Sequence, residues 1–167
     1  MTISSPERRR VHPSERALPT SYTFSRDLLF AEQSVAHHLD GEAQLLEISA
    51  DARIDPRVRA EAARFAAELE PETAALVAWL QSRGYDSVTD REGSLCSLHS
   101  VGTLKGKELT LGILDLWDMN LMAGVTRCLN LLLFQRTSEV GQIARRLVAK
   151  KEACLERVRE LREEIAD

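Results

Sequence analysis

Four long stretches of this chain repeat apolar residues at intervals of three and four, and that period constrains the fold more than any other feature. A period of 3.6 residues is that of one buried face of an α-helix. Ala, Leu, Glu and Arg dominate the composition, so helix propensity is high almost everywhere. The pattern therefore predicts an all-α protein.

The first hairpin is expected to hold two helices. The apolar repeat predicts the first helix over about residues 22–50. The second should begin at Asp55-Pro56, because Asp is a favoured N-cap and Pro fits the first helical position. Gly84 lies where a helix C-cap glycine belongs, and Pro71 should kink this helix.

The second hairpin follows a long connection over residues 85–103 that is rich in Gly, Asp and Ser. Thr103 is the expected N-cap of a third helix that runs to about Gln135. The segment Arg136-Thr137-Ser138 should cap a fourth helix, with Glu139 favourable to its dipole. Two hairpins with short turns and one longer link predict a single four-helix-bundle domain over residues 21–167.

Residues 1–20 lack the apolar period and carry three prolines among Ser, Arg and Glu. A flexible N-terminal tail is the simplest interpretation, and a basic tether for an acidic partner is the alternative.

Charge and composition exclude several classes of protein. A formal net charge of −4 argues against a nucleic-acid-coating protein, which would carry a basic face. No apolar run approaches the ~20 residues of a membrane helix, and no export signal is recognisable. The three cysteines are odd in number and widely spaced, which suits a reducing compartment. We therefore expect a cytoplasmic protein with no nucleic-acid or membrane partner, and no disulfide between Cys128 and Cys154.

Several charged residues fall on the apolar stripes, where burial is costly unless they are paired. They are Glu32, His38, Glu42, Glu72, Asp118 and Lys151. One interpretation is an internal polar network, with Lys151 paired to Asp118 or a glutamate and His38 paired to Glu42. The other makes the Glu and His side chains metal ligands in the bundle core.

Weaker metal signals occur elsewhere. Cys96 and His99 lie in the long connection, but two such groups cannot fill a zinc site, so a free thiol beside a solvated histidine is expected. Met119 and Met122 on the third helix suggest core filler, with a soft-metal thioether site as the alternative. The Glu-x-x-His spacing of di-iron bundles appears nowhere, which disfavours an oxidative di-iron enzyme.

One segment resembles a known family. It comprises Phe30 to Gln33, the pair His37-His38, Asp55 to Ala60, Glu72, and Ala78 to Leu80 followed by Gly84. These motifs are similar to the ferritin-like domain-of-unknown-function family 305. The resemblance covers residues 24–86 well and residues 99–165 weakly, and it implies an internally duplicated, ferritin-like four-helix bundle.

Members of that family are often linked to copper handling, so the resemblance implies binding of copper or another transition metal. The candidate ligands are His37, His38, Glu42 and Glu72, in a non-catalytic bundle. In the second half, Val125-Thr126 and Cys154 stand where the duplicated histidine pair and glutamate would fall. The alternative is therefore a metal-free helical scaffold or oligomerising adaptor, for which a homodimer or protein partner is expected.

Overall fold

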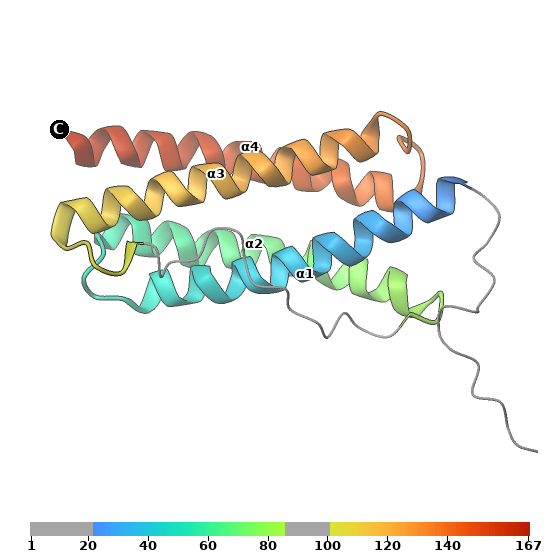
Figure 1. Cartoon of the computed structure of the whole chain (residues 1–167), viewed down its shortest axis with the longest axis horizontal. Coiled ribbons are helices and arrows are strands. Elements are labelled where there is room, and N and C mark those ends of the chain that lie inside the picture. The colour runs from blue at the N-terminus through green and yellow to red at the C-terminus, as the bar shows by residue number, and fades with distance from the viewer. Residues whose placement is uncertain (1–21, 86–100) are drawn as a thin grey trace, which may run out of the picture.

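The computed structural model describes residues 22–85 and 101–167, which form four helices: α1 Tyr22–Ala50, α2 Pro56–Gln81, α3 Gly106–Leu132 and α4 Glu139–Ala166. The described residues contain no strand. The α1–α2 hairpin forms one layer and the α3–α4 hairpin the other, as the lower and upper halves of Figure 1 show. The predicted bundle of two helical hairpins is confirmed. The predicted 1–20 tail lies outside the described residues.

Local capping explains where two of the helices begin. The Asp55 carboxylate accepts a hydrogen bond from the Arg57 backbone N–H, and Pro56 is the first residue of α2. Ser138 Oγ accepts from Gly141 N at 2.9 Å at the start of α4. Both predicted N-caps are confirmed, and Gly84 adopts a positive φ of 78° just beyond α2. Pro71 lies within α2 without ending it.

The third helix is the one whose ends were predicted wrongly. It begins at Gly106 after Lys105, whose side chain makes no capping hydrogen bond, so Thr103 is not the N-cap. It ends at Leu132 rather than near Gln135. Gly106 has a φ of 55°, a conformation that glycine adopts without strain. The backbone therefore turns into α3 at Gly106, three residues after the predicted cap Thr103.

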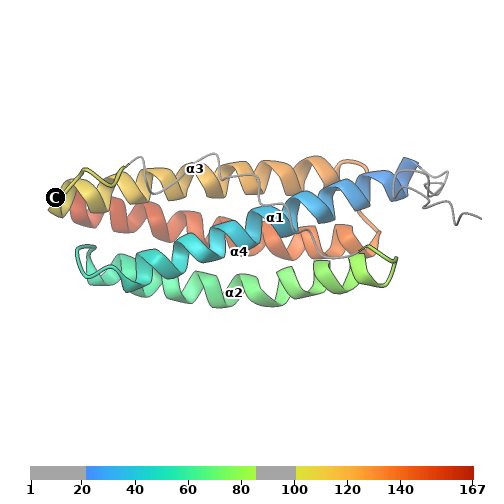
Figure 2. The same cartoon turned by 60° about the horizontal axis from the view of Figure 1, so that its bottom comes forward.

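The two hairpins join mainly through α2 and α4. Contacts are dense within each hairpin and substantial between α2 and α4, whereas α1 meets α3 and α4 at few positions. Figure 2 shows α1 crossing the bundle obliquely, with its C-terminal end nearer α2. The apolar core includes Val35, Val58, Leu76, Leu114 and Leu147, all fully buried. The α1–α3 seam is consequently the loosest in the bundle.

Two ion pairs between described residues join α3 to α4 on the outer side of the α3–α4 hairpin. Arg159 Nε lies 2.7 Å from Asp118 Oδ1, and Arg162 Nε lies 2.5 Å from Asp115 Oδ1. The predicted Asp118–Lys151 pair is therefore wrong. Lys151 packs against Gly124, about one helical turn beyond its expected level on α3, and its side chain points inward. Asp118 is half-buried at the edge of the α3–α4 contact, where Arg159 reaches it.

The core stripe of α3 also differs in detail from the prediction. Leu129 is 47% exposed, and Met119 and Met122 are exposed rather than core filler. The buried stripe instead includes Trp117, Gly124, Cys128 and Leu131. Cys128 and Cys154 are both buried and free, in agreement with the sequence expectation.

Gly141 provides a stability test of the α3–α4 turn. A Cβ atom at this position would lie 1.7 Å from the Gln135 backbone carbonyl oxygen, so Gly141→Ala forces the turn to move. We expect a loss of about 1–3 kcal/mol or more in the free energy of unfolding, measured by urea denaturation. Gly41→Ala is the control, because its Cβ would meet nothing within 4 Å. It should be neutral or gain about 0.5–1 kcal/mol from helix propensity. Equal effects of the two substitutions would contradict this view of the turn.

Candidate functional site

Glu72, a predicted metal ligand, is instead the centre of an ion-pair cluster between α2 and α4. Its side chain is buried and accepts hydrogen bonds from Arg146 Nε at 3.0 and 3.2 Å. Lys150 Nζ lies 3.0 Å from Glu72 Oε1. Burial acts to raise the pKa of Glu72, but hydrogen bonds from these two cations hold the pKa below its usual value. Two positive partners therefore already satisfy this carboxylate.

The remaining predicted ligands do not form one coordination set. Glu42 and Glu32 are half-buried on α1, and neither forms a hydrogen bond or ion pair with a described residue. Within residues 22–85 and 101–167, no group of three or more His, Cys, Asp or Glu side chains could hold a metal ion. The structure therefore keeps only the pair His37 and His38 together, with ring centroids 6.1 Å apart.

His38 is fixed by a hydrogen bond to the neighbouring helix rather than by Glu42. Its Nδ1 lies 3.1 Å from Thr73 Oγ1, and that hydroxyl donates to the Leu69 carbonyl oxygen at 3.2 Å. When the hydroxyl proton lies on the Leu69 carbonyl oxygen, a neutral His38 donates from Nδ1 to Thr73 and carries a lone pair on Nε2. The predicted His38–Glu42 pair is wrong, because the buried His38 ring hydrogen-bonds to Thr73 of α2, whereas Glu42 is half-buried on α1.

Lys151 is the unusual charged group of the core. Its side chain is only 3% exposed, and no hydrogen bond or ion pair joins it to a described residue. It crosses the face of α3 at Gly124, where a Cβ would lie 2.9 Å from Lys151 Nζ and 3.1 Å from Cδ and Cε. Glycine at position 124 therefore gives the lysine room to reach the interior.

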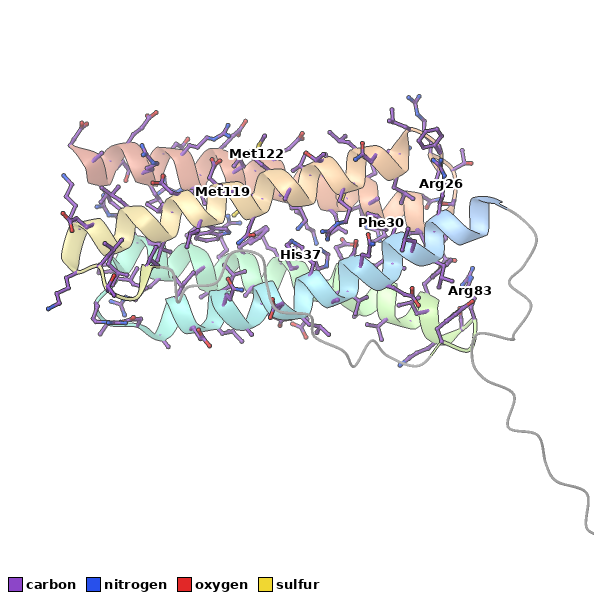
Figure 3. All side chains as sticks on the ribbon, viewed as in Figure 1. Arg26, Phe30, His37, Arg83, Met119 and Met122 are labelled. Atoms are coloured by element: carbon purple, nitrogen blue, oxygen red, sulfur yellow. The ribbon has the colours of Figure 1, made fainter. Side chains whose placement is uncertain are left out.

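Lys151 and the two histidines line one cavity of about 50 Å³ in the middle of the bundle. We call it the central cavity. Its opening lies between α1 and α3, at the half-buried residues His37, Gly41, Gln44 and Asn120. Its floor consists of buried residues from all four helices, namely His38, Leu45, Phe65, Leu69, Trp117, Leu121 and Lys151. Figure 3 labels His37 on α1 at this seam.

The electrostatics of the central cavity are positive. The pKa of Lys151 is lowered to about 8, chiefly by burial and also by Arg127, while Cys128 and Cys154 oppose the shift. Burial, Lys151 and Arg127 lower the pKa of His37 to about 4. Burial, then Lys151, His37 and Arg127 hold the pKa of His38 well below 6.5. At neutral pH the cavity thus contains two neutral imidazoles and one largely protonated amine.

Comparisons with protein-family models, with curated proteins and with solved structures found no match for this chain. The resemblance to the ferritin-like family 305 therefore stays a prediction. No helix in the described part of the chain is long and apolar enough to span a membrane. Cys96 and His99 lie outside the described residues.

Sequence reasoning recognised Lys151 as a charge on a buried stripe but assigned it a partner that it does not contact. It missed Gly124, Trp117 and Asn120. A glycine on the buried face of α3, opposite a buried lysine, was the available signal for Gly124. The cavity itself depends on the α1–α3 separation, for which the sequence carries no local signal.

Replacing Lys151 with Met should stabilise the protein at neutral pH. Since folding depresses this pKa from 10.5 to about 8, the folded state binds fewer protons between these values, and stability rises with pH across that window. At pH 7 the whole penalty applies, so Lys151→Met should add up to about 3 kcal/mol, at 1.36 kcal/mol per pKa unit. Urea denaturation of both proteins at several pH values from 7 to 10.5 would show the difference shrinking.

Lys150→Met is the matched control on the next residue. It removes one of the two cations that contact Glu72, so it should destabilise the protein by about 1 kcal/mol. A Lys151→Met protein that is less stable than the parent at pH 7, with the same pH slope, would contradict the prediction.

Proposed function

We propose that this bundle is a non-catalytic binding protein whose central cavity receives the anionic group of a small molecule. The observation that carries the proposal is Lys151, a buried lysine on the wall of a cavity, whose ammonium has no partner among the described residues. The free protein bears the desolvation cost of this charge. An anion that enters the cavity would offset that cost, so the bound protein would be stabilised relative to the free protein.

The composition of the cavity supports a singly charged ligand. Among the residues that the structure describes, no acidic side chain lines the cavity and competes for the ammonium. Of the described lining residues, Lys151 alone carries a full charge, since both histidines are held neutral. The amides of Gln44 and Asn120 stand at the opening, where they can donate to a carboxylate oxygen. A monocarboxylate fits this set of one cation and a few neutral donors.

The cavity size supports entry of an anionic group rather than of a whole metabolite. A volume of about 50 Å³ exceeds the ~10–15 Å³ that one water requires, so it accommodates a carboxylate with a few attached atoms. Aromatic and aliphatic side chains make up the rest of the floor. Small-molecule sites characteristically combine such apolar walls with a few fixed polar groups.

Binding of acetate and benzoate, compared with acetamide and benzamide, tests the proposal. Trp117 lines the cavity and reports occupancy by fluorescence, and Trp79→Phe leaves it as the only tryptophan. Carboxylates should bind and the amides should not. Lys151→Met should weaken carboxylate binding about 10- to 100-fold, as expected for one charge-assisted hydrogen bond. Affinity should fall about tenfold per pH unit above about pH 8, as the amine loses its proton.

Two further substitutions control for geometry and net charge. Gly124→Ala keeps the charge but displaces Lys151 Nζ, so it should also weaken carboxylate binding. Lys107→Met removes an exposed cation outside the cavity and should leave affinity unchanged. Carboxylate affinity equal to amide affinity, or unchanged in Lys151→Met, would overturn the proposal.

Transition-metal binding at His37 and His38, with copper as the first ion to examine, is a second proposal. Two neighbouring imidazoles are neutral at pH 7, which is the form that coordinates metals. Glu72 is not available to them, because Arg146 and Lys150 occupy it. Ligands beyond the two histidines would have to come from water or from a second molecule.

The two proposals predict opposite effects of the same substitution. Removing the positive charge in Lys151→Met should strengthen Cu²⁺ or Zn²⁺ binding several-fold while it weakens carboxylate binding. The double substitution His37→Ala and His38→Ala should abolish metal binding. Isothermal titration of the metal-free protein measures both. Absence of uptake by the parent and by Lys151→Met, or uptake that survives loss of both histidines, would rule out this site.

A self-associating scaffold is the third proposal, and an exposed apolar surface on α3 supports it. Met119, Met122 and Leu129 are between 44% and 58% exposed at helical spacing. Figure 3 labels both methionines. Light scattering over a wide concentration range would detect a homodimer, and a strict monomer at high concentration would contradict one.

A further inference from the structure

A second concave surface continues the α1–α3 seam away from the central cavity. It is a groove of about 610 Å³ between the N-terminal half of α1 and the C-terminal half of α3. Its apolar lining includes Leu29, Phe30, Ala123 and Leu131. We call it the seam groove. No acidic side chain from the described ranges 22–85 and 101–167 lines it, and its remaining side chains are amides, a threonine and two arginines.

The seam groove and the central cavity are neighbours on both helices. Gln33 of the groove lies one helical turn before His37 of the cavity on α1. On α3, Ala123 of the groove follows Leu121 of the cavity by two residues. Arg26 and Phe30 are labelled further along the same edge of α1 in Figure 3. A molecule that extends out of the cavity along the seam therefore meets the groove directly.

We propose that the ligand is a medium-chain alkyl carboxylate, with its carboxylate at Lys151 and its hydrocarbon chain in the seam groove. This inference rests on the proposed function and specifies the class of molecule. The unpartnered ammonium at one end and the apolar lining beyond it are complementary to the two parts of such an amphiphile.

The length of the seam indicates the length of the chain. His37 and Arg26 are eleven residues apart on α1, or about 16 Å at ~1.5 Å per residue, which an extended chain of roughly ten to twelve carbons would span. At the far end the Arg26 guanidinium lies 3.7 Å from the centre of the Phe134 ring. A longer chain would pass this pair and emerge into solvent.

A hydrocarbon chain fits better than an acidic peptide helix. A volume of about 50 Å³ around Lys151 is too small for a backbone and its side chain, whereas it accepts a carboxylate group.

The test is a chain-length series of acetate, hexanoate, octanoate, decanoate and laurate, with dodecanol as the uncharged probe. Trp117 fluorescence in the full-length Trp79→Phe protein reports binding. Affinity should rise about two- to four-fold per added methylene while the chain lies in the groove, and should level off near ten to twelve carbons. In Lys151→Met, laurate and dodecanol should bind with equal affinity.

Substitutions that fill the groove locate the chain. Ala123→Phe should abolish the dependence on chain length while acetate binds as in the parent, since Ala123 lines the groove but not the cavity. Gln33→Phe fills the groove from α1 and should likewise abolish the dependence on chain length. Ala149→Phe, at an exposed position on α4, is the control and should change nothing. Circular dichroism confirms that each variant is folded.

The outcomes separate this inference from the proposed function. Carboxylates that bind with no dependence on chain length would overturn the inference and leave the anion site intact. A dependence on chain length that survives both groove substitutions places the chain elsewhere and also overturns it. Failure of every carboxylate, acetate and benzoate included, would instead reject the anion site itself.

Discussion

The seam between α2 and α4 holds the two hairpins together, and the other features of the bundle follow from it. Ion pairs follow this seam over its length, from Arg57 with Glu164 to the Glu72 cluster and on to Arg83 with Glu139. Among the described residues, no ion pair bridges α1 and α3. Because the hairpins are joined on one side, α1 and α3 remain apart, and the central cavity and the seam groove open between them. Exposed pairs contribute little stability individually, so the Glu72 cluster, whose carboxylate is buried, is the strongest of these ties.

Lys151 places stability and binding in opposition. A methionine would fill the same position without a desolvation cost, so the ammonium reduces the stability of the empty protein at neutral pH. Gly124 adds to that cost, because glycine within a helix is less stabilising than alanine. Strained or costly features of this kind are common at functional sites, where the bound state relieves them. The pairing of a buried cation with a glycine that admits it is therefore more informative than either residue alone.

The metal hypothesis and the anion hypothesis draw on overlapping residues, but the structure separates their requirements. The metal site predicted from the sequence needed Glu72 beside His37 and His38, whereas Glu72 faces α4 and is already paired. Anion binding needs a cation without acidic neighbours, and the lining of the central cavity has that composition. In the tautomer that donates from Nδ1, His38 Nε2 can coordinate a metal, or it can accept a hydrogen bond from the Lys151 ammonium or from a ligand.

The sequence by itself determined the helices, because their signals are local. The apolar period located α1, α2 and α4, and Asp55-Pro56 and Ser138 predicted two of the starting points correctly. The sequence also identified Lys151 and Glu72 as charges on buried faces. Only the tertiary structure decided their partners, since Lys151 lies about one helical turn beyond its expected level on α3 and packs against Gly124 instead of pairing with Asp118. Axial register and helix rotation arise from the packing of all four helices together, and a repeat within one helix does not specify them.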